Sequence, residues 1–193
     1  MFIHVPKTGG NSIQNVLRNY SEDTIVTIGK HQDGVERFEV RNDHYAITKH
    51  STLSEYREVI DQETFSQLYK FATVRNPWDM MISFYFSPHR RVDEWNRNAF
   101  LVLLGQVHPI RQYIATADHH DLCQEIDFII RFERLNEDFA KVCRRLELPL
   151  EELPIRNKSN RKHYAAYYDE ELVGLVRMKF HEEIELGPYE FNR

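Results

Sequence analysis

A lysine followed by two adjacent glycines stands near the start of the chain, in the segment Pro-Lys-Thr-Gly-Gly at residues 6–10. Glycine lets a backbone approach a phosphate closely and adopt positive φ, and a lysine ammonium adds a point charge. At a helix N-terminus, unpaired backbone N–H groups and the helix dipole also favour an anion. These residue types in this order predict a phosphate-binding loop, with donors from Lys7, Thr8, Gly9, Gly10, Asn11 and Ser12.

Two other interpretations of this loop follow from its residues. One is a plain strand–helix turn with a solvated lysine, because short glycine motifs often occur by chance. The other is a Walker A loop, which reads GxxxxGK[ST] and places its lysine after the glycines. Here Lys7 precedes Gly9 and Gly10 and the loop is shorter, so the spacing disfavours an ordinary ATPase.

A second strand-to-helix junction repeats this geometry at residues 71–85, FATVRNPWDMMISFY. Arg75 ends the expected strand, where its guanidinium could hold a phosphate through two hydrogen bonds. Ser83 lies about two helical turns further on and could face the same anion. In the alternative interpretation, Arg75 pairs with a carboxylate and Ser83 is a surface hydroxyl.

A basic segment, RNKSNRKH, occupies residues 156–163 of a chain whose formal net charge is −5. By itself it could be a solvated surface loop. The acidic net charge argues against a general nucleic-acid binder.

The elements that would position these residues alternate between strands and helices. The expected strands cover residues 2–5, 24–28, 44–47, 69–74 and 126–133, with 44–47 the weakest. The expected helices cover residues 11–20, 53–60, 63–68, 77–86, 136–146 and 169–183, with an irregular helical stretch at 93–118. We expect Asn11 or Ser12, Thr52 with Glu55, and Asn76 with Pro77 to begin three of these helices.

Such an alternation predicts a parallel sheet covered on both faces, that is, a three-layer α/β/α fold. At 193 residues the chain suits one domain, which we expect to span residues 1–193. A parallel sheet places its ligand sites at the carboxyl ends of its strands. We therefore expect Lys7 and Arg75 to lie side by side at one edge of the sheet.

Taken together, the two loops resemble those of the PAPS-dependent sulfotransferases, particularly the carbohydrate-type branch; PAPS is 3′-phosphoadenosine 5′-phosphosulfate. FIHVPKTGGNS (residues 2–12) is similar to the 5′-phosphosulfate loop of that family, and VRNPWDMMISFY (74–85) to its 3′-phosphate motif. The resemblance continues through ITKHSTLSEY (47–56), IIRFERLNEDFAKVCRRLELPL (129–150) and RNKSNRKHYAAYYDEEL (156–172).

The resemblance implies a P-loop-like nucleotide-binding fold, PAPS as sulfuryl donor, PAP as product and no metal. It assigns the 5′-phosphosulfate to Lys7, Thr8, Gly9, Gly10, Asn11 and Ser12, and the 3′-phosphate to Arg75 and Ser83. It also implies that the basic segment covers the nucleotide, through Lys158, Ser159 and Arg161. Asn11 replaces a common threonine and Met80 a common arginine, which changes local polar contacts but leaves the cofactor assignment intact.

Sulfuryl transfer to a hydroxyl requires in-line positioning, stabilisation of the leaving phosphate, and removal of the acceptor proton. Lys7 suits the second role. For the base we predict His50, since the reference pKa of histidine is about 6.5; a merely capping role near Thr52 is the alternative. His44 is the second candidate, and Glu55 is less favoured.

The predicted activity is therefore the sulfation of a hydroxyl acceptor, which the carbohydrate-type resemblance makes a carbohydrate. A nucleotide-dependent phosphotransferase or kinase, and a non-catalytic nucleotide-binding protein, are the alternatives.

Several other features bound this prediction. The two cysteines form no CxxC pair, and we expect His119 and His120 to lie in a solvated turn, so no metal site is predicted. No apolar run is long enough to span a membrane. With a strand expected at residue 2, no room remains for a signal peptide. We therefore expect a cytoplasmic protein, or a piece trimmed of an N-terminal anchor.

Overall fold

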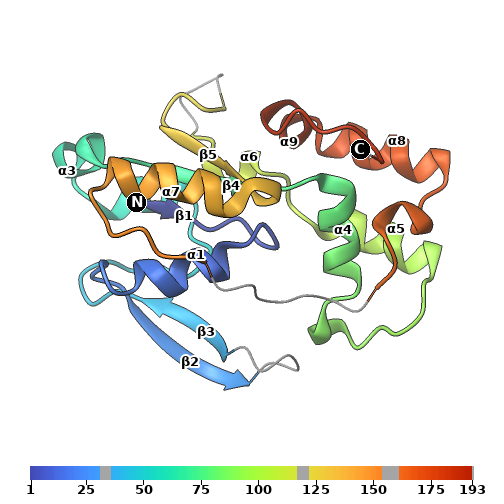
Figure 1. The fold of residues 1–193 in the computed structure, drawn as a ribbon, viewed down its shortest axis with the longest axis horizontal. Coiled ribbons are helices and arrows are strands. Elements are labelled where there is room, and N and C mark those ends of the chain that lie inside the picture. Colours follow the sequence, from blue (N-terminus) through green and yellow to red (C-terminus); the bar gives the residue numbers. More distant parts are fainter. Residues whose placement is uncertain (31–35, 117–121, 154–160, 193) are drawn as a thin grey trace.

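The computed structural model describes residues 1–30, 36–116, 122–153 and 161–192 (Figure 1). Its central sheet has three parallel strands in the order β1-β4-β5. These are β1 (Phe2–Ile3), β4 (Phe71–Val74) and β5 (Phe128–Arg131). All four residues of β4 are buried, as expected for the middle strand of a sheet covered on both faces.

Helices cover both faces of this sheet. On one face α1 (Gly10–Leu17) and α7 (Leu135–Arg145) contribute Ile13 and Phe139 to a core that also contains Phe71. The opposite face packs against α2 (Leu53–Val59), α3 (Gln62–Gln67) and α6 (Arg111–Ile114). The three-layer α/β/α fold is thus confirmed.

The predicted second and third strands are wrong as members of this sheet. β2 (Thr24–Lys30) pairs antiparallel with β3 (Glu36–Arg41) in a separate two-stranded sheet that lies below α1 in Figure 1. The alternation of polar residues with buried Phe38 and Val40 was the available signal for β3.

Residues 44–47 form no strand. The side-chain oxygen of Asn42 accepts hydrogen bonds from the backbone N–H groups of His44 and Tyr45, at 2.9 and 3.0 Å. Such a local side-chain turn competes with strand pairing.

A second, largely helical core lies beside the sheet layers. Its buried members include Trp78, Tyr85, Phe100, Val176 and Phe180. They come from α4 (Pro77–Tyr85), α5 (Arg97–Gln106) and α8 (Glu170–Lys179), with Phe180 joining α8 to α9 (His181–Leu186). Short 3₁₀ turns at η1 (Pro88–Arg90), η2 (Phe132–Arg134) and η3 (Tyr164–Tyr167) complete the elements.

Two of the three predicted helix starts are confirmed. Thr52 and Glu55 form a capping box on α2, and the Asn76 side chain caps α4 with Pro77 in its first turn. The predicted cap of α1 is wrong, because Gly9 is its N-cap and no side chain caps this helix. Asn11 and Ser12 lie inside its first turn instead. Across the described ranges, no helix combines the length and apolarity needed to cross a bilayer.

Candidate active site

The loop between β1 and α1 requires both of its glycines. Gly9 has a φ of 92°, and a Cβ there would lie 3.0 Å from side-chain carbons of Phe132 and Leu135. A Cβ on Gly10 would overlap the imidazole of His4, only 2.5 Å from its Nε2. The loop therefore packs tightly on its own strand and on the start of α7, and its backbone is fixed.

Two of the predicted side-chain donors in this loop are buried. The Thr8 hydroxyl donates to the carbonyl of Val5 at 2.7 Å and contacts the Thr73 hydroxyl of β4. Thr8 thus braces the loop against the central strand through its hydroxyl. Ser12 is also buried, whereas Asn11 is half-buried.

Lys7 adopts a left-handed backbone, with a φ of 66°. Its ammonium donates to the Ser87 hydroxyl at 2.8 Å, just beyond the end of α4. Burial, together with the nearby charges of Arg75 and Lys49, lowers the pKa of Lys7 from 10.5 to about 8. A cation held in this way binds an incoming anion more strongly than a solvated lysine would, because less water competes.

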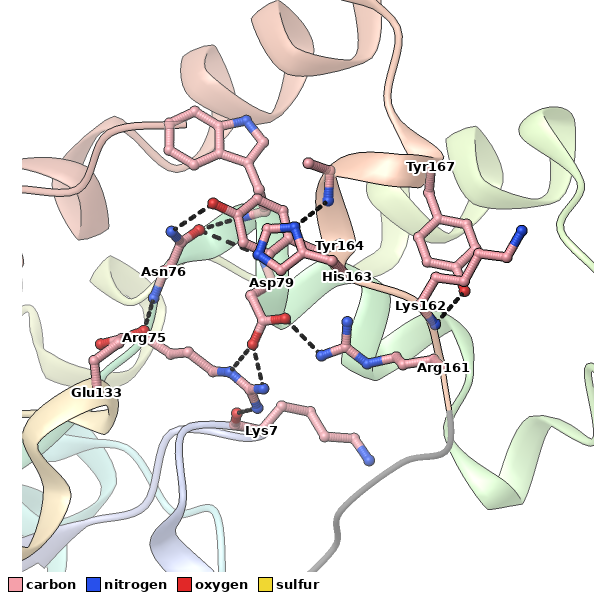
Figure 2. A network of polar contacts seen from close by, with 12 residues as sticks. Lys7, Arg75, Asn76, Asp79, Glu133, Arg161, Lys162, His163, Tyr164 and Tyr167 are labelled. Carbon is pink, nitrogen blue, oxygen red and sulfur yellow. Dashed lines mark hydrogen bonds and ion pairs between the residues drawn. The ribbon is translucent and has the colours of Figure 1, made fainter. Parts of the chain in front are cut away.

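Arg75, at the end of β4, contacts the first loop directly (Figure 2). Its Nη1 donates to the carbonyl of Lys7 at 2.8 Å, and its Cζ lies 3.9 Å from the centre of the Phe132 ring. The prediction that Lys7 and Arg75 lie side by side is confirmed.

Asp79 is the carboxylate partner that the alternative interpretation gave to Arg75. Its Oδ2 accepts from Arg75 Nε at 3.0 Å and also from Nη2, and its Oδ1 accepts from Arg161 Nη2 at 2.6 Å. Arg75 and Asp79 are four residues apart, so this pair could have been found from the sequence. A guanidinium has five N–H groups, and the bonds to Lys7 and Asp79 use only part of them.

Ser83 lies one helical turn beyond Asp79 on α4 and is half-buried. Residues four apart on a helix share a face, so Ser83 lies on the side of α4 that faces the two arginines.

His50 contacts His4, the residue at the start of the first loop. Its Nδ1 is 2.9 Å from the carbonyl of His4, and its ring packs edge-on against the His4 ring at 4.5 Å. A carbonyl can only accept, so Nδ1 holds the proton and Nε2 presents its lone pair. Desolvation lowers the pKa of His50 below 6.5, which keeps the ring neutral at pH 7.

The competing roles around His50 are filled by other groups. Thr52 caps α2, so the proposed capping role of His50 is wrong. The Glu55 carboxylate accepts from the Thr52 backbone N–H at 2.7 Å within the capping box. Lys49, next to His50, donates to the carbonyl of Phe38 at 3.2 Å and joins this segment to the β2–β3 sheet.

The structure describes only residues 161–163 of the predicted basic segment. Lys158 and Ser159 lie outside the described residues, as do His119 and His120. Arg161 is described, and its bond to Asp79 brings it to the site. Tyr168, which follows this segment, donates to the carbonyl of Trp78 at 2.8 Å and packs against the helical core.

Three contacting residues were missed from the sequence: Asp79, Ser87 and Phe132. Ser87 and Phe132 gave no signal, because long-range packing alone brings them to Lys7 and Arg75. Within the described ranges, no cluster of three His, Cys, Asp or Glu side chains is placed to hold a metal ion.

The assembled site is cationic around a single rigid loop. Lys7, Arg75 and Arg161 supply its positive charge. The imidazole of His50 is held at the His4 carbonyl, three residues before Lys7. This arrangement can bind a ligand with more than one anionic group and can remove a proton beside it.

The family model described as "Sulfotransferase family" matches residues 1–190. No curated protein and no solved structure matches the chain.

Proposed function

The chain belongs to the sulfotransferase family, and from this premise we propose that it moves a sulfuryl group from PAPS to a carbohydrate hydroxyl. Sulfuryl transfer to a hydroxyl-type acceptor is the chemistry of the family. The observation that best supports PAPS as donor is the hydrogen bond of 2.8 Å between Arg75 and the Lys7 carbonyl. It joins two anion-binding loops, as a nucleotide with phosphates at both ends requires.

The donor set fits such a nucleotide. The 5′-phosphosulfate would lie over the loop of Lys7, Gly9, Gly10, Asn11 and Ser12. This loop is held close to His4, because a Cβ on Gly10 would overlap the His4 ring. Arg75, Ser83 and Arg161 would hold the 3′-phosphate. Lys158 and Ser159 stay predicted contacts, and we assign Thr8 to bracing the loop rather than to ligand binding.

When bound, PAPS supplies an activated sulfuryl group with PAP as its leaving group. Lys7 would stabilise the negative charge that grows on the leaving phosphate, because its ammonium is partly desolvated. His50 would accept the proton of the acceptor hydroxyl at Nε2, since Nδ1 is oriented by the His4 carbonyl.

Ligand preference separates this proposal from a phosphotransferase. Adenosine 3′,5′-bisphosphate, at 100 times its dissociation constant, should stabilise the protein by about 2.7 kcal/mol. ATP should give a much smaller shift, because it has no 3′-phosphate for Arg75. Thermal denaturation with each nucleotide measures the difference. A larger shift with ATP would instead support the phosphotransferase.

A measurement of turnover distinguishes the proposed sulfotransferase from a non-catalytic nucleotide-binding protein. With labelled PAPS and a panel of glycans and small alcohols, we expect transfer by the wild type. His50→Ala should lower kcat about a hundredfold or more, with the Kd for adenosine 3′,5′-bisphosphate within about twofold. His44→Ala is the matched control, since the His44 side chain is exposed and only its backbone N–H binds Asn42. Equal activity in both variants would remove His50 from the mechanism.

A further inference from the structure

Asp79 joins two arginines that come from distant parts of the chain. Arg75 ends β4, whereas Arg161 precedes η3 (Figure 2). The side chains of Arg75, Asp79 and Arg161 are only 10%, 22% and 11% exposed. Exposed ion pairs contribute little to stability, but water screens the charges of this buried cluster much less.

Each carboxylate oxygen of Asp79 binds one of the two arginines. Oδ2 accepts from Arg75, and Oδ1 accepts from Arg161 at 2.6 Å. Burial opposes ionisation of Asp79, but Arg75 and Arg161 outweigh it and hold the pKa of this carboxyl below 3.8. Asp79 is therefore charged at every pH at which the protein would work.

The Arg75–Asp79 half of this cluster is rigid. Asp79 lies in the first turn of α4, which Asn76 caps and Pro77 begins. Arg75 is further held by the Lys7 carbonyl and by the Phe132 ring. The backbone of Asp79 is thus fixed four residues from Arg75, and its carboxylate binds Arg75 through both Nε and Nη2.

We infer that Asp79 is a positioning residue that creates the preference for a 3′-phosphate, by holding Arg161 beside Arg75 so that both guanidiniums face one anion. This inference rests on the proposed function and names the residue that makes its second phosphate site selective. Asp79 acts through the arginines and does not touch the ligand.

Simple electrostatics makes the opposite prediction. Neutralising Asp79 adds one positive charge to the site and would strengthen the binding of any anion. If Asp79 acts by orientation, Asp79→Asn weakens binding, because Arg161 loses the charged acceptor that holds it. The direction of the change in affinity therefore decides between the two.

The test compares three nucleotides by isothermal titration calorimetry: adenosine 3′,5′-bisphosphate, adenosine 2′,5′-bisphosphate and 5′-AMP. For Asp79→Asn we expect about a tenfold loss of affinity for the 3′,5′ isomer. Affinity for 5′-AMP should change by less than about twofold, and the preference for the 3′ over the 2′ isomer should largely disappear. With PAPS as substrate, KM should rise while kcat stays within about threefold.

Two further variants protect this test against simple misfolding. Arg161→Gln leaves Arg75 and Asp79 paired and should show the same loss, and the double variant should be no worse than Arg161→Gln alone. Glu171→Gln is the matched control. Glu171 lies on α8 and pairs with Arg97, so this variant also removes one negative charge and one contact with an arginine. It should leave all three affinities unchanged.

The outcomes separate the inference from the proposed function. If the wild type does not bind adenosine 3′,5′-bisphosphate, the proposed function fails and the inference fails with it. If the wild type binds it and prefers the 3′ isomer, but Asp79→Asn keeps that preference or binds more tightly, only the role of Asp79 is overturned. Additive losses in the double variant would likewise show that Asp79 does not act through Arg161.

Discussion

Lys7 combines two unfavourable features at a single residue. Its φ of 66° lies in the left-handed region that side chains disfavour, and its ammonium is partly removed from water. Features of this kind concentrate at functional sites, where the surrounding structure compensates for them. Here the compensation comes from Ser87 and from the Arg75 bond to the Lys7 carbonyl.

The lowered pKa of Lys7 predicts a pH dependence of nucleotide binding. Below about pH 8 the ammonium is charged and affinity for adenosine 3′,5′-bisphosphate should be constant. Above pH 8 the unliganded protein loses this proton, while bound phosphates favour the charged form, so affinity should fall by up to about tenfold per pH unit. Measuring Kd from pH 7 to 9.5 tests this.

Lys7→Arg is the control for this prediction, because a guanidinium stays charged across the whole range. Its affinity should not fall in this window. An equal fall in both proteins would assign the titration to another group.

At this scale the sequence predicted that Lys7 and Arg75 lie together, because each follows an expected strand that the structure contains. His50 was placed by an expected strand at 44–47 that does not form, so its bond to the His4 carbonyl could not be predicted in this way. Asp79 was predictable from its spacing to Arg75. Thr8 was not, because the hydrogen bond to Val5 and the contact with Thr73 depend on how the loop folds back onto β4.

At the scale of elements, α9 supports the start of α6 through a buried carboxylate. Glu183 Oε1 accepts from the backbone N–H of Ile110, the N-cap residue of α6, at 2.6 Å. Its Oε2 has no hydrogen-bond partner among the described residues. Burial raises the pKa of Glu183 from 4.5 to about 7.

Glu183→Gln should therefore stabilise the protein at alkaline pH. Between pH 4.5 and 7 the unfolded chain loses this proton while the folded protein keeps it, so wild-type stability falls as pH rises through this window. The shift corresponds to at most about 3 kcal/mol. Urea denaturation should show Glu183→Gln more stable than wild type at pH 8, with a smaller difference at pH 5.

Glu185→Gln is the matched control, since Glu185 is an exposed carboxylate on the same helix. It should leave stability nearly unchanged at both pH values. A similar gain from both variants would point to surface charge rather than burial.

Local signals decided which elements could be predicted. Two helix starts depend only on residues close together in the sequence, and both were confirmed. These are the capping box of Thr52 with Glu55 and the start at Asn76 and Pro77. The pairing of β2 with β3 was missed because β3 itself was not predicted, although these strands are consecutive in the chain and Phe38 and Val40 alternate with polar residues.

At the scale of the whole molecule, the candidate site lies where the sheet layers meet the helical core. β4 contributes to the sheet cores and continues through Arg75 and Asn76 into α4, which belongs to the helical core. The last described residues hold the helical core together, because Phe191 packs edge-on against Trp78, Tyr164 and Tyr168.

Phe191→Ala should thus destabilise the whole protein, by about 2 kcal/mol for a half-buried ring. Chemical denaturation followed by tryptophan fluorescence measures this, with Trp78 as a nearby reporter. Leu150→Ala is the control, since Leu150 is 61% exposed and should cost little. An unchanged free energy of unfolding for Phe191→Ala would mean that the C-terminal residues do not pack in solution.

The predicted phosphate loop and the proposed base, His50, are connected through a single residue, His4. Gly10 packs against the face of His4, and the His4 carbonyl orients His50. If residues 4–12 were grafted onto another protein, the graft would therefore carry the predicted anion-binding loop but not the proposed base. The segment around residue 50 would have to be grafted with it.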